Sequence, residues 1–340
     1  MRLGRNGRQH RQRLRGRLRR KQDQSSRDWS IQKPQGRGVT LAFDPEFIKE
    51  LPRPPARPHD GHKGTFGTVI VIGGYPTMPG AAALCARAAF RTGCGLVKIA
   101  SDPQTLSIAL SVMPSATGLA ITGDPASDVR TIDDADPRGR AILAVGPGWG
   151  RGGSRAALLE LLLQGQRPIV LDADGLHALA ELVARRPDAI ASLKTRAAPL
   201  ILTPHPGEFR SLAEIAIVAP NPAADPTDPA QRPAAAAQLA KAFSATVVLK
   251  GANTVVGDRT GTRVYLNATG NPALATAGTG DVLTGMIASL LAQGMPAFDA
   301  ARLGVFVHGR AGDQWTHRNG HAGLLAHDLC DNIPAAISSV

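Results

Sequence analysis

Apolar and polar residues alternate along the chain in blocks whose period switches between that of a buried strand and that of a helix. A continuous β-branched run at 68–72 predicts a strand buried on both faces. Further strands are predicted at 96–100, 141–145, 168–171, 200–203, 246–249, 253–256 and 263–266. Helical periodicity predicts helices at 80–92, 154–163, 175–186, 207–215 and 233–243. Strands that alternate with helices indicate an α/β fold, with a central, mostly parallel sheet covered by helices on both faces.

Three segments depart from this alternation. The prolines between 52 and 58 predict an extended segment ahead of the first strand. The strands at 253–256 and 263–266 are separated by six turn-forming residues, which predicts a hairpin at the edge of the sheet. A Pro-, Ala- and Asp-rich stretch from Pro220 to Pro233 predicts a surface loop.

The positive charge of the chain is concentrated at its N-terminus. The 340 residues carry a net charge of +12, and residues 1–37 hold 13 Lys and Arg against two acids, or +11. We therefore expect a disordered basic tail over 1–39 and one α/β domain over 40–340. Three interpretations of the tail stay open: an arm that binds polyanions such as nucleic acid, a transit peptide, or a translation start assigned too early.

The composition excludes several classes of protein. No apolar run reaches the ~18 residues of a membrane-spanning helix, so we expect no membrane partner. The cysteines are scattered and odd in number (Cys85, Cys94 and Cys330), which argues against a disulfide framework and predicts a reducing, cytoplasmic location. The sequence contains no Gly-x-Ser-x-Gly elbow and no Walker A motif, which excludes the common serine-hydrolase and P-loop designs.

Candidate chemistry gathers where the predicted strands end. Two strands run into glycines, at 73–74 and 146–150, and three run into polar groups, at 172–174, 203–208 and 250–251. Because ligands of open α/β sheets bind beyond the carboxyl ends of the strands, we expect one site along this edge. Each motif also has a structural interpretation. The Asp172–Asp174 pair, for example, suits either water-mediated Mg²⁺ binding or the capping of a helix.

The segment Gly278-Thr279-Gly280-Asp281 precedes a strongly periodic helix that Gly294 is expected to end. Backbone N–H groups of a glycine-rich loop and the dipole of the following helix favour a phosphate or a developing negative charge. Asp281 is placed to take a proton from a hydroxyl that attacks this phosphate. The alternative is a glycine-rich turn whose aspartate only caps the helix.

In this order, the motifs resemble those of the ADP/ATP-dependent NAD(P)H-hydrate dehydratases, a branch of the ribokinase-like superfamily. The resemblance covers about 40 to 335 and is most specific at 203–208 together with 270–283. It implies a ribokinase-like fold and the repair of S-form NADHX and NADPHX, by phosphorylation of the C6 hydroxyl followed by loss of phosphate. Larger relatives carry an epimerase domain, for which the basic tail is too short, so the chain resembles the stand-alone form.

The resemblance also implies roles for individual residues. Asp281 would be the catalytic base, with Gly278, Thr279 and Gly280 in the anion hole. The hydrate would contact Ala81, Gly148, His205 and Asp281, and the nucleotide Lys250, Gly251, Ala252, Asn253, Thr254 and Gly280. The resemblance further implies Mg²⁺ with ADP or ATP as co-substrate, a separate epimerase as functional partner, and a homo-oligomer, a tetramer. The alternative function is a ribokinase-like kinase of a small hydroxyl compound such as a vitamin precursor.

Overall fold

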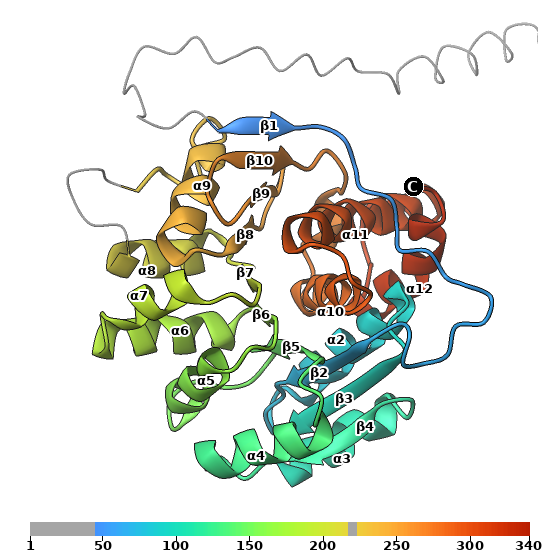
Figure 1. Ribbon diagram of the computed structural model, residues 1–340. Coiled ribbons are helices and arrows are strands. Elements are labelled where there is room, and N and C mark those ends of the chain that lie inside the picture. The colour runs from blue at the N-terminus through green and yellow to red at the C-terminus, as the bar shows by residue number, and fades with distance from the viewer. Residues whose placement is uncertain (1–44, 217–222) are drawn as a thin grey trace, which may run out of the picture. The chain divides into compact units, whose positions relative to one another are not determined.

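The computed structural model describes residues 45–216 and 223–340 of the chain. Ten strands in these residues form one sheet in the order β1-β10-β9-β8-β7-β6-β5-β2-β3-β4 (Figure 1). All neighbouring pairs are parallel except the two that β9 makes with β8 and β10. The strands are β1 Glu46–Ile48, β2 Thr68–Ile72, β3 Leu96–Ser101, β4 Thr117–Ala120, β5 Ile142–Val145, β6 Ile169–Leu171, β7 Leu200–Leu202, β8 Thr246–Leu249, β9 Val255–Gly257 and β10 Arg263–Leu266.

Helices cover both faces of the sheet (Figure 1). One hydrophobic cluster joins the sheet to α2, α10, α11 and α12, and a second joins the opposite face to α5, α6, α8 and α9. The helices are α2 Pro79–Thr92, α3 Pro103–Val112, α4 Pro125–Ala135, α5 Arg155–Gln164, α6 Asp174–Arg185, α7 Ala189–Thr195, α8 Pro206–Ala216, α9 Arg232–Phe243, α10 Thr279–Ala292, α11 Ala297–Asn319 and α12 Ala326–Ile337, with a 3₁₀ turn η1 at Pro272–Leu274.

The central strands explain why the chain folds in layers. Along β2, Val69 and Val71 enter the first cluster, whereas Ile70 and Ile72 enter the second, because successive strand side chains point to opposite faces. Both faces of β2 are therefore apolar, which accounts for its uninterrupted β-branched sequence. The predicted α/β class with a mostly parallel sheet is confirmed.

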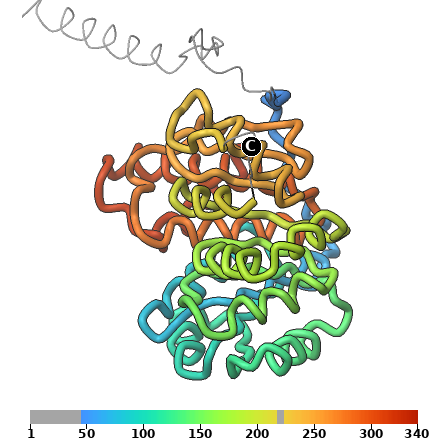
Figure 2. The backbone as a smooth tube through the Cα atoms, turned by 90° about the vertical axis from the view of Figure 1, so that its left-hand side faces the viewer, coloured from blue at the N-terminus to red at the C-terminus, as the bar shows by residue number. Residues whose placement is uncertain are grey.

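The predicted hairpin exists, but its predicted place at the sheet edge is wrong. β9 and β10 pair antiparallel, and β1 then pairs with β10 and occupies the edge. Figures 1 and 2 show this early strand, in blue, beside the orange strands from near residue 260. Three residues are too few to display an alternating pattern, so no local pattern indicated β1.

Other boundaries also differ from the predictions. The loop predicted up to Pro233 ends earlier, because α9 begins at Arg232 and proline is well tolerated in the first helical turn. The part of that loop at 217–222 lies outside the described residues, as does the proposed division at 39/40, which stays a prediction. Gly294 has φ +92 just after α10, as expected for the glycine that ends this helix.

Two helices that approach the site are packed unusually closely. A Cβ on Gly285 of α10 would overlap the carbonyl oxygen of Cys85 in α2, so only glycine permits this approach. The facing side of α2 is built from buried alanines, which suits a chain with only 4% aromatic residues. Ala81 lies near the start of α2 and Asp281 near the start of α10, so this contact fixes the distance between them.

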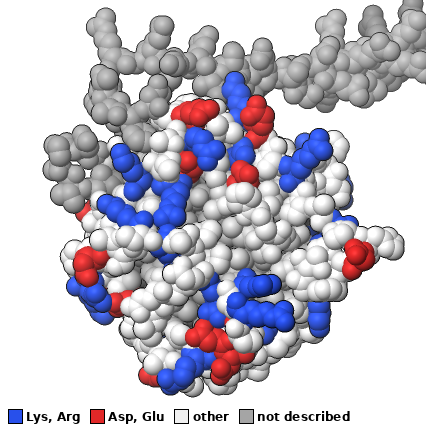
Figure 3. Space-filling model, viewed as in Figure 1, with Lys and Arg blue, Asp and Glu red and all other residues white. Residues whose placement is uncertain are grey.

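The surface of the described residues shows no dominant charge. Beyond residue 37 the chain carries 26 basic and 25 acidic residues, and Figure 3 shows both kinds interspersed on the face of Figure 1. None of the described helices is long and apolar enough to cross a membrane.

Candidate active site

The loop that leads into α10 is held rigidly by its own side chains. Gly278 is the N-cap residue of α10 and has φ +90, a left-handed conformation that favours glycine. The Thr279 hydroxyl lies 2.9 Å from the carbonyl oxygens of both Leu274 and Thr276. His308 of α11 places Nε2 2.9 Å from the Thr279 carbonyl oxygen. Burial lowers the pKa of His308 to about 4, so a neutral imidazole supports this loop.

This rigid loop leaves backbone donors free at the start of α10. The N–H groups of Gly278, Gly280 and Asp281 make no hydrogen bond within the described residues. The N–H of Thr279 differs, since it points to the Thr276 carbonyl oxygen at 3.4 Å. Of the three residues expected in an anion hole, Gly278 and Gly280 therefore offer free donors, and Asp281 adds another. Unpaired donors at a helix N-terminus favour a bound anion.

Asp281 occupies the third position of α10 and has an unusual environment. No group in the described part of the chain donates a hydrogen bond to its carboxylate, and its side chain therefore does not cap the helix. Burial, together with the charges of Asp172 and Asp174, raises the pKa of Asp281 to about 8, and the Lys250 ammonium opposes this rise. A carboxyl with a raised pKa and no fixed partner is suited to exchanging a proton near neutral pH.

A buried ion pair lies beside Asp281. The Nζ atom of Lys250, at the end of β8, lies 2.5 Å from Oδ1 of Asp172, at the end of β6. The hydroxyls of Thr203 and Thr284 each donate to this carboxylate at 2.8 Å. Burial alone would lower the pKa of Lys250, but Asp172 and Glu208 outweigh burial and hold it above its ordinary value. The lysine therefore carries a positive charge into the site.

His205 lies at the start of α8 and forms a capping box there. Its Nδ1 accepts hydrogen bonds from the backbone N–H groups of Gly207 and Glu208, at 2.9 and 3.2 Å. The Glu208 carboxylate in turn accepts from the backbone N–H of His205 at 2.8 Å. Because Nδ1 is an acceptor, Nε2 carries the proton; it lies 3.5 Å from Oε1 of Glu208, on a side chain that is 56% exposed and therefore accessible to a ligand.

The loop at 250–254, predicted to contact the nucleotide, is anchored by Arg232 and by Pro204. Arg232 is buried and donates to the carbonyl oxygens of Leu249 and Lys250, at 2.8 and 3.1 Å. The N–H of Lys250 bonds to Pro204, which ties this loop to the His205 loop. Gly251 and Asn253 both have positive φ, and residues 251–253 are exposed. Residues 251–253 of the loop are thus exposed to solvent, while the Lys250 side chain reaches Asp172 in the site.

The glycine-rich loop after β5 lies against the start of α2. A Cβ on Gly148 would lie 2.7 Å from Cβ of Ala81, so the structure brings these two predicted hydrate contacts together. The backbone N–H of Gly150 donates to Asp174 at 2.8 Å, which joins this loop to the ion-pair region. Between Asp172 and Asp174, Ala173 has φ 46 and ψ −118, a strained conformation of the kind found near functional sites.

The structure does not support the capping interpretation of the aspartate pair, and water-mediated Mg²⁺ binding stays a prediction. Neither side chain caps α6, because Asp172 holds Lys250 and Asp174 holds the Gly150 loop. Within 45–216 and 223–340, no three His, Cys, Asp or Glu side chains come close enough together to hold a metal ion.

Comparisons with known proteins show the family of the chain. Residues 69–335 match the family model described as NAD(P)H-hydrate dehydratase. A Neisseria meningitidis protein named ADP-dependent (S)-NAD(P)H-hydrate dehydratase is 41% identical over 286 residues, which cover 83% of this chain and 87% of that protein. The chain belongs to the NAD(P)H-hydrate dehydratase family.

Two further family members set the extent of the similarity. The bifunctional NAD(P)H-hydrate repair enzyme Nnr of Moorella thermoacetica is 38% identical over 84% of this chain but 52% of its own length. The chain thus spans about half the length of that curated relative. The Bacillus subtilis ADP/ATP-dependent NAD(P)H-hydrate dehydratase, co-crystallised with ATP/Mg²⁺, matches with a TM-score of 0.67 and 31% identity over 84% of this chain and 94% of that one. The resemblance to the family and its ribokinase-like fold is confirmed.

Several supporting residues of this dehydratase-family site were missed by sequence reasoning. His308 and Asp313 of α11 both hold the segment before α10. Asp313 accepts hydrogen bonds from the Gly270 N–H at 3.0 Å and the Asn271 side chain at 2.8 Å. Thr284 follows the Gly278–Asp281 segment closely, but its partner Asp172 lies 112 residues away, and Arg232 lies 18 residues from Lys250, so nothing in their local patterns indicates these contacts.

Proposed function

We propose that the protein catalyses the nucleotide-dependent dehydration of S-form NADHX and NADPHX to NADH and NADPH. The observation that supports this most directly is the start of α10, where a carboxylate and N–H groups that have no hydrogen-bond partner among the described residues share a helical turn. A base beside an anion site is what phosphorylation of a hydroxyl requires. Membership of the family and the name of the N. meningitidis relative support the choice of substrate.

In the first step, Asp281 takes the proton of the C6 hydroxyl, and the hydroxyl oxygen attacks the terminal phosphorus of the nucleotide. A C6–O–P linkage forms while the bond from phosphorus to the bridging oxygen breaks, which leaves AMP or ADP. Negative charge on the moving phosphoryl group is stabilised by the N–H groups of Gly278 and Gly280 and by the Lys250 ammonium. The Thr279 side chain keeps these donors in place.

In the second step, the lone pair of the ring nitrogen expels phosphate from C6, and a proton leaves C5 to restore the double bond. Hydroxide is a poor leaving group near neutral pH, whereas phosphate is a good one, so the first step makes the second possible. Ala81, Gly148 and the Nε2 atom of His205 are proposed to hold the hydrate during both steps. No redox change occurs, in keeping with a lyase.

The nucleotide is proposed to bind over the loop from Lys250 to Thr254 and against Gly280. Mg²⁺ would neutralise charge on the nucleotide phosphates. Because the described residues offer no cluster of three ligating side chains, the phosphates and water would supply most of its ligands. We favour ADP over ATP as donor, because the relatives in N. meningitidis and B. subtilis are named ADP-dependent.

The proposal extends to the setting of the enzyme. Three free, buried cysteines support a reducing location such as the cytoplasm. The bifunctional relatives support assigning the epimerisation of the R form to a separate protein. A homo-oligomer, a tetramer by family resemblance, completes the proposal.

The test is recovery of dihydronicotinamide absorbance when purified protein is incubated with S-NADPHX, Mg²⁺ and ADP or ATP. We expect recovery with one inorganic phosphate released per turnover. A ribokinase-like kinase of a small hydroxyl compound would instead leave hydrate absorbance unchanged and form a stable phosphate ester with its own substrate.

A further inference from the structure

Part of the sheet has the strand order of a dinucleotide-binding fold. The six parallel strands β4-β3-β2-β5-β6-β7 run outward from β2 to β4, and the chain then returns to place β5 on the other side of β2. In doubly wound sheets, ligands bind in the crevice where the strand order reverses. That reversal lies between β2 and β5, whose ends carry the glycine pair at 73–74 and the glycine-rich loop at 146–150.

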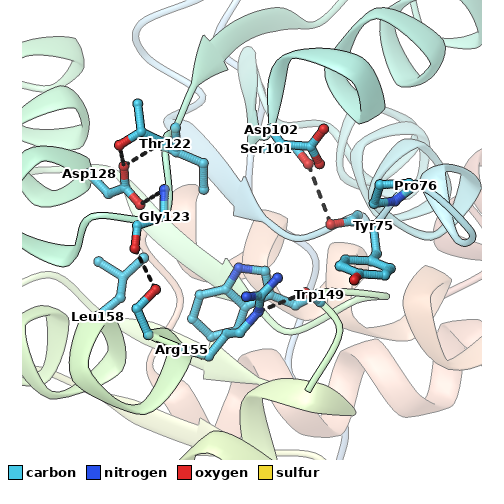
Figure 4. A pocket seen from close by; sticks show the side chains of 13 residues that line it. Tyr75, Pro76, Ser101, Asp102, Thr122, Gly123, Asp128, Trp149, Arg155 and Leu158 are labelled. Carbon is cyan, nitrogen blue, oxygen red and sulfur yellow. Dashed lines mark hydrogen bonds between the residues drawn. The ribbon is translucent and has the colours of Figure 1, made fainter. Parts of the chain in front are cut away.

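A cavity of about 210 Å³ opens beside this reversal. Its walls come from the ends of β2, β3, β4 and β5 and from the starts of α3, α4 and α5 (Figure 4). The residues that matter for its chemistry are Tyr75, Asp102, Trp149 and Arg155. Gly150 packs so closely against the Tyr75 ring that a Cβ at this position would lie only 2.9 Å from it. The glycine-rich loop that carries Gly148 therefore also packs against the Tyr75 wall of the cavity.

One side of the cavity is suited to a phosphate between aromatic groups. The Arg155 guanidinium lies 5.8 Å from the centre of the Tyr75 ring, and its Nε donates to the Trp149 carbonyl oxygen at 3.2 Å. Its remaining N–H groups make no hydrogen bond within the described residues. Figure 4 shows this guanidinium beside the Trp149 ring and across the cavity from Asp102.

The other side carries a charged acceptor. Asp102 follows β3 directly and caps α3, where its Oδ1 accepts from the N–H groups of Gln104 and Thr105 at 3.1 and 3.0 Å. Burial raises the pKa of this carboxyl, but the hydrogen bonds from Thr105 and Gln104 outweigh burial and hold the pKa below its ordinary value. Its Oδ2 makes no hydrogen bond in the described part of the chain. Asp128, the other acid in the cavity, has both oxygens occupied by Thr122 and Gly123.

Asp102 occupies the position in the fold at which other nucleotide-binding sheets carry a ribose-binding acid. In mononucleotide-binding βαβ units, the acid at the end of the second strand accepts hydrogen bonds from a ribose 2′-hydroxyl. Here β2, the glycine pair, α2 and β3 form such a unit, and Asp102 stands at the end of its second strand. Three strand spacings separate β6, where Asp172 lies, from β3, or about 14 Å, which an extended dinucleotide can span.

We propose that this cavity binds the adenosine end of the dinucleotide hydrate, with the ribose diol on Asp102 and the diphosphate on Arg155. The carboxylate then repels a 2′-phosphate, so the enzyme prefers NADHX to NADPHX. The inference rests on the proposed function, which places the nicotinamide end of the same molecule against Asp281, Gly148 and Ala81.

The test compares kcat/KM for S-NADHX and S-NADPHX in the full-length wild-type protein and in Asp102→Asn, at saturating ADP and Mg²⁺. Asparagine caps helices as well as aspartate does, so α3 stays intact while the charge is lost. We expect the wild type to favour NADHX by about tenfold or more, and the variant to lose most of that ratio. A binding assay without turnover should show the same preference. ADP-ribose should compete more strongly than 2′-phospho-ADP-ribose for the wild type, and this difference should shrink in Asp102→Asn.

The matched control is Asp124→Asn. Asp124 also precedes a proline and caps a helix, α4, through Ser127 at 2.8 Å, but it does not line the cavity. We expect its substrate ratio to equal that of the wild type. An unchanged ratio in Asp102→Asn, with both hydrates still converted, would overturn the inference and leave the proposed function standing. A folded wild type that converts neither hydrate would overturn both.

Discussion

Two stretches of the same sheet edge differ in composition: one carries charged side chains, and the other is rich in glycine. At the ends of β6 and β8, Asp172, Asp174 and Lys250 place charge around Asp281, and the Asp172 carboxylate is held by Lys250, Thr203 and Thr284. At the ends of β2 and β5, the chain offers closely packed glycine backbone, as where Gly148 approaches Ala81, and a cavity beside it. Under the proposed function, the first stretch sets the proton affinity of Asp281 and binds phosphate, whereas the second accepts the bulk of the hydrate.

The difference teaches that substitutions should separate into two classes. Changes beside the charged stretch should alter rate and pH dependence. Changes beside the glycine stretch, and at the cavity next to it, should alter binding of the hydrate. This division would be wrong if a change beside the charged stretch altered only hydrate binding, or if a change beside the glycine stretch altered the pH dependence.

The largest effect is expected from Asp281→Asn. Loss of a general base should reduce kcat by about 10²–10⁴-fold. Asparagine has the shape of the protonated acid, so nucleotide binding should change little. The measurement is steady-state turnover together with ADP binding, and near-normal turnover would remove Asp281 from the mechanism.

The same variant should be more stable than the wild type. Folding raises the pKa of Asp281 from 3.8 to about 8, so the folded state holds a proton that the unfolded state releases. This group therefore makes the wild type progressively less stable as pH rises from about 4 to about 8, and asparagine avoids the loss. Thermal melts at pH 5 and pH 8 should show a larger gain in Tm at pH 8.

Lys250→Met should weaken nucleotide binding by roughly tenfold or more and move the pH profile. In the wild type, kcat/KM for the hydrate should rise with pH through the pKa of Asp281, because only the ionised carboxylate accepts a proton. Lys250 lowers that pKa, so its removal should shift the profile to higher pH. The loss leaves Asp172 buried without its cation, so a melting curve is needed beside the kinetics. A profile that stays in place would show that Asp281 is not the group being titrated.

A pair of glycine variants separates backbone strain from ligand contact. A Cβ on Gly280 would meet no protein atom closer than 3.6 Å, and Gly280 does not have positive φ, so Gly280→Ala should fold normally. It should nevertheless slow turnover by about tenfold, because the added methyl group lies where phosphate approaches the N–H groups. Gly278→Ala should lose Tm as well, since this glycine has φ +90 and a Cβ would lie 2.8 Å from Leu84. Normal kinetics in Gly280→Ala would place the phosphate elsewhere.

His205→Asn should raise KM for the hydrate about two- to tenfold and leave KM for ADP nearly unchanged. Asparagine retains an acceptor that can cap α8, so the loss isolates the Nε2 donor. His205→Ala should add a stability loss of about 1 kcal/mol from the missing cap. A rise confined to KM for ADP would move His205 to the nucleotide side.

The smallest effect is expected from deletion of residues 1–37. This segment carries +11 of the charge and few apolar residues, so activity and Tm should hardly change. Affinity for polyanions should fall, and more so at low salt. A large fall in Tm would show that the segment belongs to the fold.

The sequence was most informative where local patterns control structure. The buried run at 68–72 and the glycine-rich loop before α10 follow from short-range rules of burial and helix capping, and both were located correctly. The Asp-Pro pairs at 102–103 and 124–125 begin α3 and α4, a helix-start signal that periodicity alone overlooked.

The sequence was least informative where contacts join distant segments. The pairing of Lys250 with Asp172 depends on two strands that the chain reaches 78 residues apart. The donor state of His205 depends on its capping geometry, and the raised pKa of Asp281 on burial by several elements. Such properties arise from tertiary packing, which no local pattern of residues encodes.

The close contact of Gly285 with Cys85 has a consequence for how the enzyme can be tuned. Because α2 and α10 touch backbone to backbone, we expect them to move together, so that under the proposed function the absence of a single methyl group sets the distance from Asp281 to the reacting hydroxyl. Misplacement of reacting groups by an ångström can cost about 100-fold in rate. Under the proposed function, adaptation to a differently shaped hydrate should therefore proceed more easily through the loops at the strand ends than through this helix pair, whose spacing is fixed.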